Sequence, residues 1–430
     1  METDPTRMCE LLIGLPEVNI LGIDEVAGGP LVIEIETRSA RPGCPSCGVL
    51  ASLKDRDPVV LVDLPAFGRR TRLIWRKRRF RCVDSDCGAG TFTVTERKIA
   101  APRMLITDRA GRWVTEQIGR FARSVLEVAT ELGCDWHTVN DAVIAYGEVL
   151  VYDPGRIGRV EAIGLDEVLF VRRGPRHHQE FSTTIADVRA GQLLDVVPGR
   201  GAREPIAWLK GRGAQWLSGI VFATLDLSGT YRSVFDAVVP LAIQVADPFH
   251  VVKHANAKLD ECRRRVQNQT LGHRGRKGDP LYRCRRLLTR AEERLDEAGT
   301  DKLLGLLRAG DPKGEVTTAW HAKEAVRELY SHNDEMLARE WIDRLIIDMA
   351  DSDNPVEVRS LGGTLKRWKN QIVAWHRSQV TNGPTEATNN LIKRVKRAAF
   401  GMRSFRNYRI RSLLYAGKPD WSLLGTVTPR

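Results

Sequence analysis

The sequence contains no apolar run that reaches the roughly 18 residues needed to cross a membrane, although 42% of its 430 residues are hydrophobic. Its start, Met1-Glu2-Thr3-Asp4, is acidic and lacks the basic region that opens a secretory signal. We therefore expect a cytoplasmic protein without a membrane partner. The length predicts about two to four domains, and the hydrophobic content is sufficient for ordinary folded cores.

Cysteine is scarce as well, with eight in the whole chain, but four of the eight form two close pairs. Cys44 and Cys47 are separated by two residues, Cys82 and Cys87 by four, and a glycine follows each pair. In a reducing compartment such pairs indicate metal binding rather than disulfides. Four thiolates close a tetrahedral Zn²⁺ site, so the pattern predicts a structural zinc ribbon rather than four unrelated cysteines.

Acidic residues are absent between Ala387 and Pro419, a stretch that contains nine Lys or Arg residues. The chain has a net charge of +12, and its basic residues cluster at 69–81, 258–286 and 393–411. A solvated surface would scatter its charges, whereas clusters favour a polyanionic partner such as nucleic acid.

The first half of the chain shows two further local patterns. Apolar runs at 18–23 and 31–35, joined by Gly28-Gly29-Pro30, predict a β-hairpin. Residues 124–132 and 135–145 predict two helices that meet at Gly133, with Asp135 or Thr138 at the start of the second. This arrangement is typical of a helix-turn-helix, although any helical hairpin has a similar pattern.

From residue 160 the pattern changes to short strands, predicted at 160–165, 181–187, 193–197, 220–225 and 243–246, with a helix at 204–209. Residues 253–376 are rich in Arg, Glu, Leu and Ala and predict a long helical segment. Strands in series followed by alternating strands and helices favour a mixed sheet covered by helices. We therefore expect an α/β core interrupted by a helical insertion.

Three acidic residues occur where they are costly or unexpected. Asp166 and Asp226 interrupt apolar strands, and Glu386 precedes the basic run of the C-terminal region. A carboxylate among Ile, Leu and Val reduces stability unless it has a partner. Three converging carboxylates hold two divalent metals for an in-line phosphoryl transfer. Mg²⁺ suits such all-oxygen ligands, and Mn²⁺ can replace it.

These features together resemble the DDE transposases of bacterial insertion sequences, specifically the ISL-three type. The resemblance covers nearly the whole chain. Its motifs are Gly164-Leu165-Asp166-Glu167, Leu225-Asp226-Leu227-Ser228-Gly229-Thr230-Tyr231, Ala246-Asp247-Pro248-Phe249-His250 and Asn382-Gly383-Pro384-Thr385-Glu386-Ala387-Thr388-Asn389-Asn390. Ala387 stands where the family usually has Gly, and Ser228 where an aromatic residue is common.

The resemblance implies a multidomain fold. We expect a β-hairpin and zinc-ribbon domain at 1–100 and a helix-turn-helix DNA-binding domain at 101–152. An α/β ribonuclease-H-like catalytic core would occupy 153–252 and 377–430, the latter with basic C-terminal helices. The all-helical insertion would occupy 253–376.

The implied activity is DNA transposition: binding of terminal inverted repeats, two-metal cleavage, and joining of 3′-hydroxyls to target DNA. Asp166, Asp226 and Glu386 would be the catalytic metal ligands, supported by Asp247, His250 and Asn389. The expected DNA contacts are Arg76, Lys77, Arg78, Arg79, His137, Thr138, Asn140, Lys393, Arg394, Lys396, Arg397 and Arg403. The expected partners are double-stranded DNA and a second copy of the chain or a higher oligomer, in a bacterial cytoplasm at the nucleoid.

Two other functions remain open from the sequence. A non-catalytic DNA-binding regulator or domesticated transposase would use the same ribbon, helices and basic surface, but would have no need of the three acids. A metal-dependent nuclease would use the acids for cleavage without joining, because hydrolysis and strand transfer take place at one site.

Overall fold

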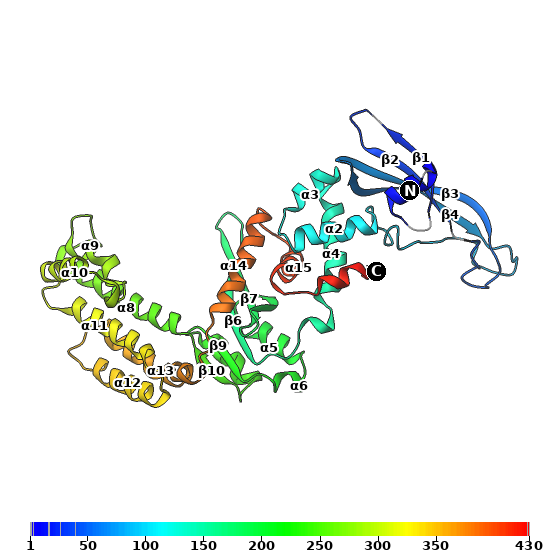
Figure 1. Cartoon of the computed structure of the whole chain (residues 1–430). Coiled ribbons are helices and arrows are strands. Elements are labelled where there is room, and N and C mark those ends of the chain that lie inside the picture. The colour runs from blue at the N-terminus through cyan, green and yellow to red at the C-terminus, as the bar shows by residue number, and fades with distance from the viewer. Residues whose placement is uncertain are drawn as a thin grey trace. The chain divides into compact units, whose positions relative to one another are not determined.

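The computed structural model describes all residues except 1, 3, 16, 17, 26, 39, 428 and 430. The chain forms two compact units (Figure 1). Unit 1 contains Met1–Gly158 and Asn390–Arg430, and unit 2 contains Arg159–Asn389. Helix α14 (Gly383–Ala398) contributes residues to both. Among the described residues, no helix is both long and apolar enough to cross a membrane.

Unit 1 is built around a five-stranded sheet. Its strands are β1 (Val18–Glu25), β2 (Leu31–Thr37), β3 (Ser52–Ala66), β4 (Arg69–Arg81) and β5 (Thr91–Thr93). The order is β1-β2-β4-β3, and β5 pairs with β4. The predicted hairpin is confirmed, because β1 and β2 pair antiparallel. Ile35, Leu73 and Trp75 are almost fully buried and form the centre of the core under this sheet.

The helices of unit 1 are α1 (Pro5–Ile13), α2 (Asp108–Gly119), α3 (Val125–Leu132), α4 (Trp136–Val151) and α15 (Phe405–Ala416), with 3-10 turns η1 (Pro154–Arg156) and η4 (Trp421–Gly425). A capping box between Ser124 and Glu127 starts α3. Gly133, at φ 66°, ends α3, and Asp135 caps α4. Residues within the turn itself therefore determine where α3 ends and where α4 begins.

The sheet of unit 2 contains β6 (Ala162–Arg173), β7 (His178–Asp187), β8 (Gln192–Pro198), β9 (Phe222–Leu225) and β10 (Ile243–Ala246). Its order is β10-β9-β6-β7-β8. Strand β7 pairs antiparallel with β6 and with β8, whereas β9 pairs parallel with β6 and β10 pairs parallel with β9. Every predicted strand is present, but β6 continues to Arg173, so Asp166 lies inside the strand.

Helices α5 (Arg203–Lys210), α6 (Ala214–Leu217) and α7 (Gly229–Val238) connect the strands of this sheet. Between β10 and α14 the described regular elements are helical. They are α8 (Pro248–Leu271), α9 (Pro280–Leu288), η2 (Glu292–Arg294), α10 (Glu297–Gly310), α11 (Glu315–Glu328), η3 (Leu329–Ser331), α12 (Glu335–Met349) and α13 (Val356–Ser378).

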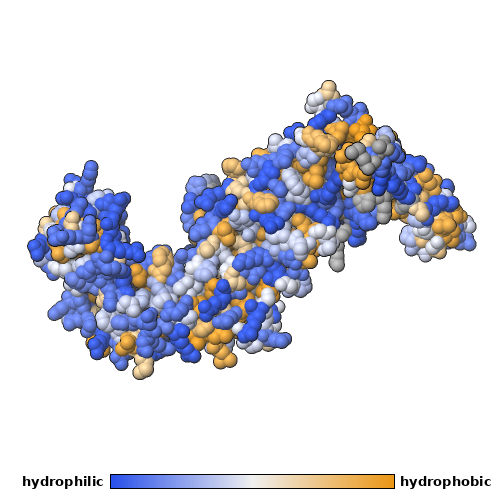
Figure 2. All heavy atoms as spheres, viewed as in Figure 1, coloured by the Kyte–Doolittle hydropathy of each residue, from blue (hydrophilic) through white to orange (hydrophobic). Residues whose placement is uncertain are grey.

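One partly buried ion cluster links three of these helices. The Arg265 guanidinium on α8 lies 2.7 Å from Glu315 Oε2 on α11 and 2.8 Å from Glu357 Oε1 on α13. Because Glu357 is buried, this arginine balances a charge that would otherwise destabilise the helical segment. On the face seen in Figure 2, mostly hydrophilic residues cover these helices.

Candidate functional site

The strand register of unit 2 places two of the predicted acids side by side. Strands β6 and β9 are parallel, with Gly164 opposite Thr224. Asp166 and Asp226 each follow two residues later along their chains. Side chains two residues apart in a strand point to the same face. Asp166 therefore extends from the face to which Gly164 belongs, and Asp226, directly after the end of β9, is near enough for its charge to act on Asp166.

The first turns of α14 pack against this face. Asn382, Thr385, Glu386 and Asn389 recur at spacings of three and four, so they share one side of the helix. The Asn389 amide donates to Asp166 Oδ2 at 2.7 Å. The Thr224 hydroxyl donates to Asn382 Oδ1 at 3.0 Å. The helix that carries Glu386 is thus tied by hydrogen bonds to both strands that carry the aspartates.

Gly164 permits this close approach. A Cβ atom at this position would overlap the Thr385 hydroxyl and would lie 2.7 Å from Asn382 Oδ1 and Val188 Cγ1. A strand glycine that faces a neighbouring backbone is the usual sign of such contact. Position 164 therefore needs glycine for space rather than for an unusual φ angle.

Asp247 connects the helix α8 to the start of α14. Its backbone N–H donates to Leu225 O at 3.2 Å, which aligns it with Asp226. One carboxylate oxygen caps α8 by accepting the Phe249 N–H at 3.0 Å, and the other accepts the Asn382 N–H at 3.1 Å. Asp247 is buried, so its role in the fold is to anchor both helices at the carboxyl edge of the sheet.

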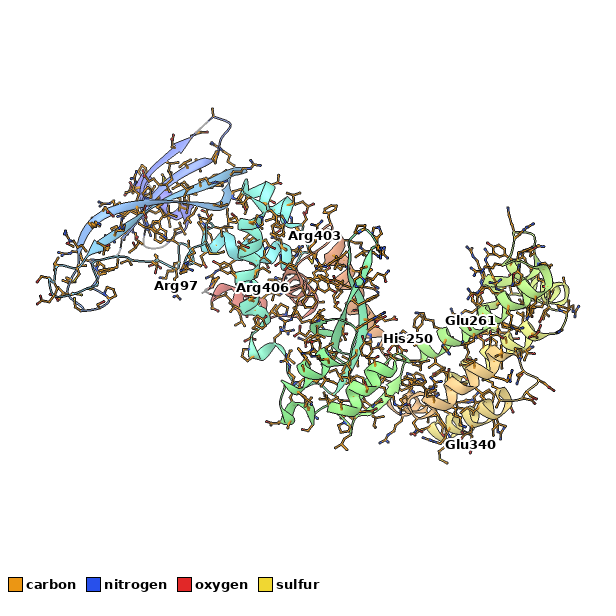
Figure 3. The ribbon with its side chains drawn as sticks, turned by 180° about the vertical axis from the view of Figure 1, so that it is seen from behind. Arg97, His250, Glu261, Glu340, Arg403 and Arg406 are labelled. Carbon is orange, nitrogen blue, oxygen red and sulfur yellow. The ribbon has the colours of Figure 1, made fainter. Side chains whose placement is uncertain are left out.

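His250, which is labelled in Figure 3, lies in the first turn of α8 and beside the third predicted acid, Glu386. Its Nε2 atom is 3.3 Å from Glu386 Oε1. The His250 side chain is 15% exposed and the Glu386 side chain is 41% exposed. The third carboxylate is therefore the most accessible of the set, and it lies near a ring nitrogen that has no hydrogen-bond partner among the described residues.

The aspartates are held in an environment that disfavours their charge. Burial raises the pKa of Asp166 to about 6, and the nearby Asp226 and Glu386 also raise it, while the Glu167 N–H and His250 act in the opposite direction. Burial also raises the pKa of Asp226 and of Asp247. Clustered acids with raised pKa values are typical of a site that accommodates a cation.

The carboxylate oxygens are the type of ligand that a hard divalent cation prefers. They do not lie as close to one another as the ligands of one shared ion would. Among the described residues, only the four cysteines discussed below form a set of three or more side chains whose ligand atoms all lie within 4.8 Å. Asp226 Oδ1 is buried without a hydrogen-bond partner in the described part of the chain. An oxygen left in this state suits a cation such as Mg²⁺, whose ligands are oxygens.

The four cysteines of unit 1 form a second candidate metal centre. Cys44 Sγ lies 3.8 Å from Cys87 Sγ, and Cys47 Sγ lies 3.5 Å from Cys82 Sγ. Tetrahedral Zn–S bonds of about 2.3 Å require sulfur atoms about 3.8 Å apart. Backbone N–H groups of Cys47 and Ser46 lower the pKa of Cys44 to about 7. The thiols therefore already have the spacing that zinc requires.

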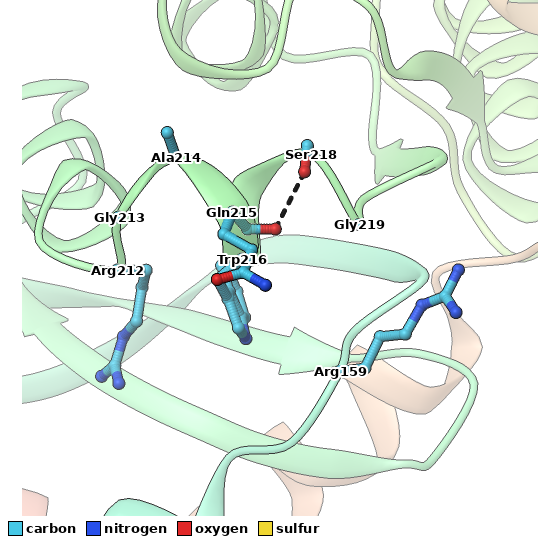
Figure 4. Close-up of a pocket in the computed structure, with 8 residues that line it drawn as sticks. All are labelled: Arg159, Arg212, Gly213, Ala214, Gln215, Trp216, Ser218 and Gly219. Atoms are coloured by element: carbon cyan, nitrogen blue, oxygen red, sulfur yellow. Dashed lines mark hydrogen bonds between the residues drawn. The ribbon is translucent and has the colours of Figure 1, made fainter.

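A cavity of about 740 Å³ lies at the other end of the unit 2 strands (Figure 4). Its lining includes Arg159, Arg212, Gln215 and Trp216. Arg159 precedes β6, and the other three residues precede β9. The cavity is therefore at the amino ends of these strands, whereas Asp226 follows the carboxyl end of β9. It contains none of the predicted site residues.

The predicted DNA contacts on β4 have protein partners. Arg76 pairs with Glu34 on β2, and Arg79 lies 3.4 Å from Asp55 on β3. Lys77 Nζ lies 4.4 Å from the Trp75 ring centroid, and the Arg78 guanidinium lies 5.8 Å from the Phe80 ring centroid. These cations thus help to order the ribbon sheet, which the sequence does not reveal.

The predicted contacts on α4 differ in exposure. His137 is exposed and Thr138 is half-buried, with its hydroxyl donating to Asp135 Oδ2 at 2.8 Å. Asn140 is buried, and its Oδ1 accepts a hydrogen bond from Asn407 of α15 at 3.1 Å. The Asn140 amide is therefore engaged inside unit 1.

The predicted basic residues after Glu386 are mostly accessible. Lys393, Arg394, Arg397 and Arg403 are exposed, and Lys396 is half-buried. The Arg394 guanidinium lies 5.6 Å from the Tyr415 ring centroid, so α15 supports its side chain. Four of these cations lie on α14, and Arg403 follows the end of this helix.

Three residues that organise the site were not assigned a role from the sequence: Gly164, Thr224 and Asn382. Each lies in or beside a motif with a predicted acid. The sequence did contain a signal for them. Each is a small or polar residue that stands two to four positions before one of the three acids. Their pairing across the sheet required the fold.

Replacement of the cysteines tests the zinc centre. We expect Cys44→Ser combined with Cys47→Ser to lose one zinc per chain in elemental analysis, because two hydroxyls cannot replace two thiolates. Cys9→Ser is the matched control and should retain the metal. A zinc-free, fully folded wild-type chain would contradict the assignment.

Gly164→Ala tests the close approach of α14. We expect it to lower the free energy of unfolding by about 1–3 kcal/mol, because the methyl group must displace Asn382 and Thr385. Gly201→Ala, where a Cβ atom meets nothing within 4 Å, is the control. Thermal unfolding of both variants measures the difference, and equal midpoints would argue against the tight contact.

The raised pKa of Asp166 predicts a dependence of stability on pH. Between the ordinary carboxyl pKa of 3.8 and about 6, the native state binds more protons than the unfolded chain, so stability falls as pH rises. Asp166→Asn should remove this slope and raise stability at pH 7 by roughly 1–3 kcal/mol. Thermal unfolding from pH 4 to pH 7, without added divalent cations, checks this. Parallel pH profiles for the variant and wild type would disprove it.

Comparison with known proteins agrees with this geometry. A family described as transposase matches residues 163–412, which include all three predicted acids. The zinc finger of the transposases of IS204, IS1001, IS1096 and IS1165 matches residues 40–87, which include the four cysteines.

The chain is also similar to two transposases of bacterial insertion sequences. The transposase for insertion sequence element IS1557 of Mycobacterium tuberculosis is 29% identical over 289 residues, which cover 63% of either chain. The transposase for IS1001 of Bordetella parapertussis is 26% identical over 378 residues, covering 84% of this chain and 85% of its own. Since the family match spans more than half of the sequence and includes the acidic cluster, the chain belongs to the ISL3 family of DDE transposases.

Proposed function

We propose that the chain binds the terminal inverted repeats of its insertion sequence and catalyses cleavage and strand transfer of DNA. The observation that carries this proposal is the register of β6 and β9, which sets Asp166 and Asp226 side by side beneath the helix of Glu386. Family membership supports the reaction class. The names of the two relatives support an insertion sequence as the substrate.

Asp166, Asp226 and Glu386 would hold two Mg²⁺ ions, or Mn²⁺ in their place. Bound there, the ions would stabilise the charge on the attacking and leaving oxygens of the phosphoryl transfer. The unpartnered Asp226 Oδ1 is available for such a ligand role. Glu386 would complete the set by turning from His250 toward the aspartates, a rotation that its 41% exposure permits.

The neighbouring residues would orient these ligands. Asn389 and the Glu167 N–H donate to the two oxygens of Asp166, at 2.7 and 2.8 Å, and so fix the plane of its carboxylate. A proton on His250 Nε2 would restrain Glu386. Asp247 keeps Asn382 at the start of α14. Such support of ligands by hydrogen bonds is general in metal sites.

We propose a ribonuclease-H-like core formed by 153–252 and 377–430, with 253–376 as a helical insertion. The mixed order β10-β9-β6-β7-β8, with three antiparallel strands followed by two parallel ones, supports it. The segment 1–100 would be the zinc-ribbon domain, and 101–152 the helix-turn-helix domain. The capped turn between α3 and α4 supports the second assignment.

DNA binding would use the exposed cations of α14 and the start of α4. Lys393, Arg394, Arg397 and Arg403 have the exposure needed to contact phosphates, with Lys396 partly exposed beside them. His137 and Thr138 are the accessible members of the α4 set, and Asn140 supports the helix from within. The four predicted cations of β4 already contact protein groups. They would have to bind DNA phosphates in addition to these groups: Arg76, Lys77, Arg78 and Arg79.

The proposed partners are double-stranded DNA of the element ends and of the target, on which the chain would act as a homodimer or higher oligomer at the bacterial nucleoid. A regulator that only binds DNA is the alternative function. The buried cluster of acids argues against it, because a pure binder gains nothing from carboxylates whose charge is disfavoured.

Replacement of Glu386 tests the proposed chemistry. We expect Glu386→Gln to reduce Mg²⁺-dependent cleavage of a duplex carrying the element end by about a thousandfold or more, because one ligand charge is lost. Binding to the same duplex should change little. Glu340→Gln, an exposed acid on α12 (Figure 3), is the control and should remain active.

The same assay separates the alternatives. A precut duplex with a free 3′-hydroxyl should be joined to target DNA by the wild-type chain. Cleavage without joined product would identify a nuclease, and binding without either reaction would identify a regulator. Undiminished cleavage by Glu386→Gln would refute the assignment of the three acids.

A further inference from the structure

Phe249 is an exposed aromatic residue at the edge of the acidic cluster. It lies in the first turn of α8, and its side chain is turned outward, since the residue is 57% exposed. Its N–H donates to Asp247 Oδ1 at 3.0 Å. The same Asp247 carboxylate receives the Asn382 N–H, so the backbone that carries the ring is fixed to the start of α14.

The neighbours of this ring are a histidine and a lysine. The His250 ring lies edge-on at 5.3 Å between centroids, and its Nε2 contacts Glu386. Lys253, one helical turn later, is exposed, and its Nζ lies 5.7 Å from the Phe249 centroid. Lys253 is also close enough to Asp226 for an electrostatic interaction. A flat apolar face and a cation thus border the same carboxylates.

These properties select a particular ligand. Single exposed apolar residues are common on protein surfaces, but this one adjoins a cation and the candidate catalytic acids on a rigid helix. A DNA duplex presents base edges in its grooves, and its base faces are covered by neighbouring bases. Inside a continuous, unkinked duplex, an aromatic ring can therefore stack only on a base that has left the duplex stack.

We propose that Phe249 and Lys253 form a binding site for one unpaired nucleotide beside the phosphate that is cleaved. The Phe249 ring stacks on the base, and the Lys253 ammonium pairs with the phosphate of the same nucleotide. This inference rests on the proposed cleavage of DNA. It adds that the ends of the element are locally unpaired when they are bound, and that α8 stabilises the unpaired strand.

The proposal is tested with the full-length chain and a duplex that carries one end of its insertion sequence, with 2-aminopurine in turn at each position flanking the cleaved bond. We expect wild type and Phe249→Trp to change the fluorescence at one flanking position on binding, and Phe249→Ala to lose that change. Lys253→Gln should weaken binding of this duplex. Leu241→Ala, which removes a 97% exposed side chain elsewhere in unit 2, is the control.

Cleavage of two substrates provides the second measurement. On a fully paired end, Phe249→Ala should be roughly tenfold to a hundredfold slower than wild type, the loss expected for one base stack. Mismatches at the flanking pairs reduce the energy needed to unpair the base. They should therefore restore most of the activity of Phe249→Ala while changing wild type little.

The outcomes distinguish this inference from the proposed function. Equal fluorescence changes in wild type and Phe249→Ala, or an equal loss of activity on paired and mismatched ends, would overturn the nucleotide site. A fluorescence change that depends on Phe249, without Mg²⁺-dependent cleavage by wild type, would retain the site and remove the proposed catalysis.

Discussion

The contact between the start of α14 and the face of β6 and β9 is the constraint on which the rest of unit 2 depends. It requires a residue without a side chain at position 164, and it is held by Thr224 and Asp247, which both bond Asn382. Glu386 follows Asn382 by one helical turn, so the position of the third acid is determined by these bonds. The aspartates are placed independently, by the register of the two parallel strands.

This arrangement concentrates acidic groups where burial disfavours their charge, which raises the pKa of Asp166 to about 6. A fold optimised only for stability would not retain the buried Asp247 and the half-buried Asp166 and Asp226 within one edge of a sheet. The hydrogen bonds from Asn389 and Asn382 offset part of this cost without adding positive charge. The cluster therefore keeps acidic groups whose charge an arginine in the same place would have neutralised.

Local patterns in the sequence predicted much of this structure. The cysteine spacing predicted the ribbon, short β-rich runs predicted every strand of unit 2, and Gly133 marked the turn between α3 and α4. Asp166 and Asp226 were singled out because charged residues stand out in apolar strands, and Glu386 was singled out because it is an acid that precedes a basic run. What could not be predicted were pairings between distant residues, such as Asn140 with Asn407, Arg76 with Glu34, and His250 with Glu386. Each depends on tertiary packing rather than on periodicity.

The long helical segment shows why Asp247 and Asn382 can meet at the site although they are far apart in the sequence. The N–H of Asn382 and the carboxylate of Asp247 bond across 135 residues, and nearly all of the intervening chain is helical. The entropy of closing a loop grows only with the logarithm of its length, by about 0.6 kcal/mol for each doubling. Helices that fold on themselves, as around Arg265, shorten the effective loop further. The segment can therefore vary in length at small cost, provided that its two ends still meet at Asp247.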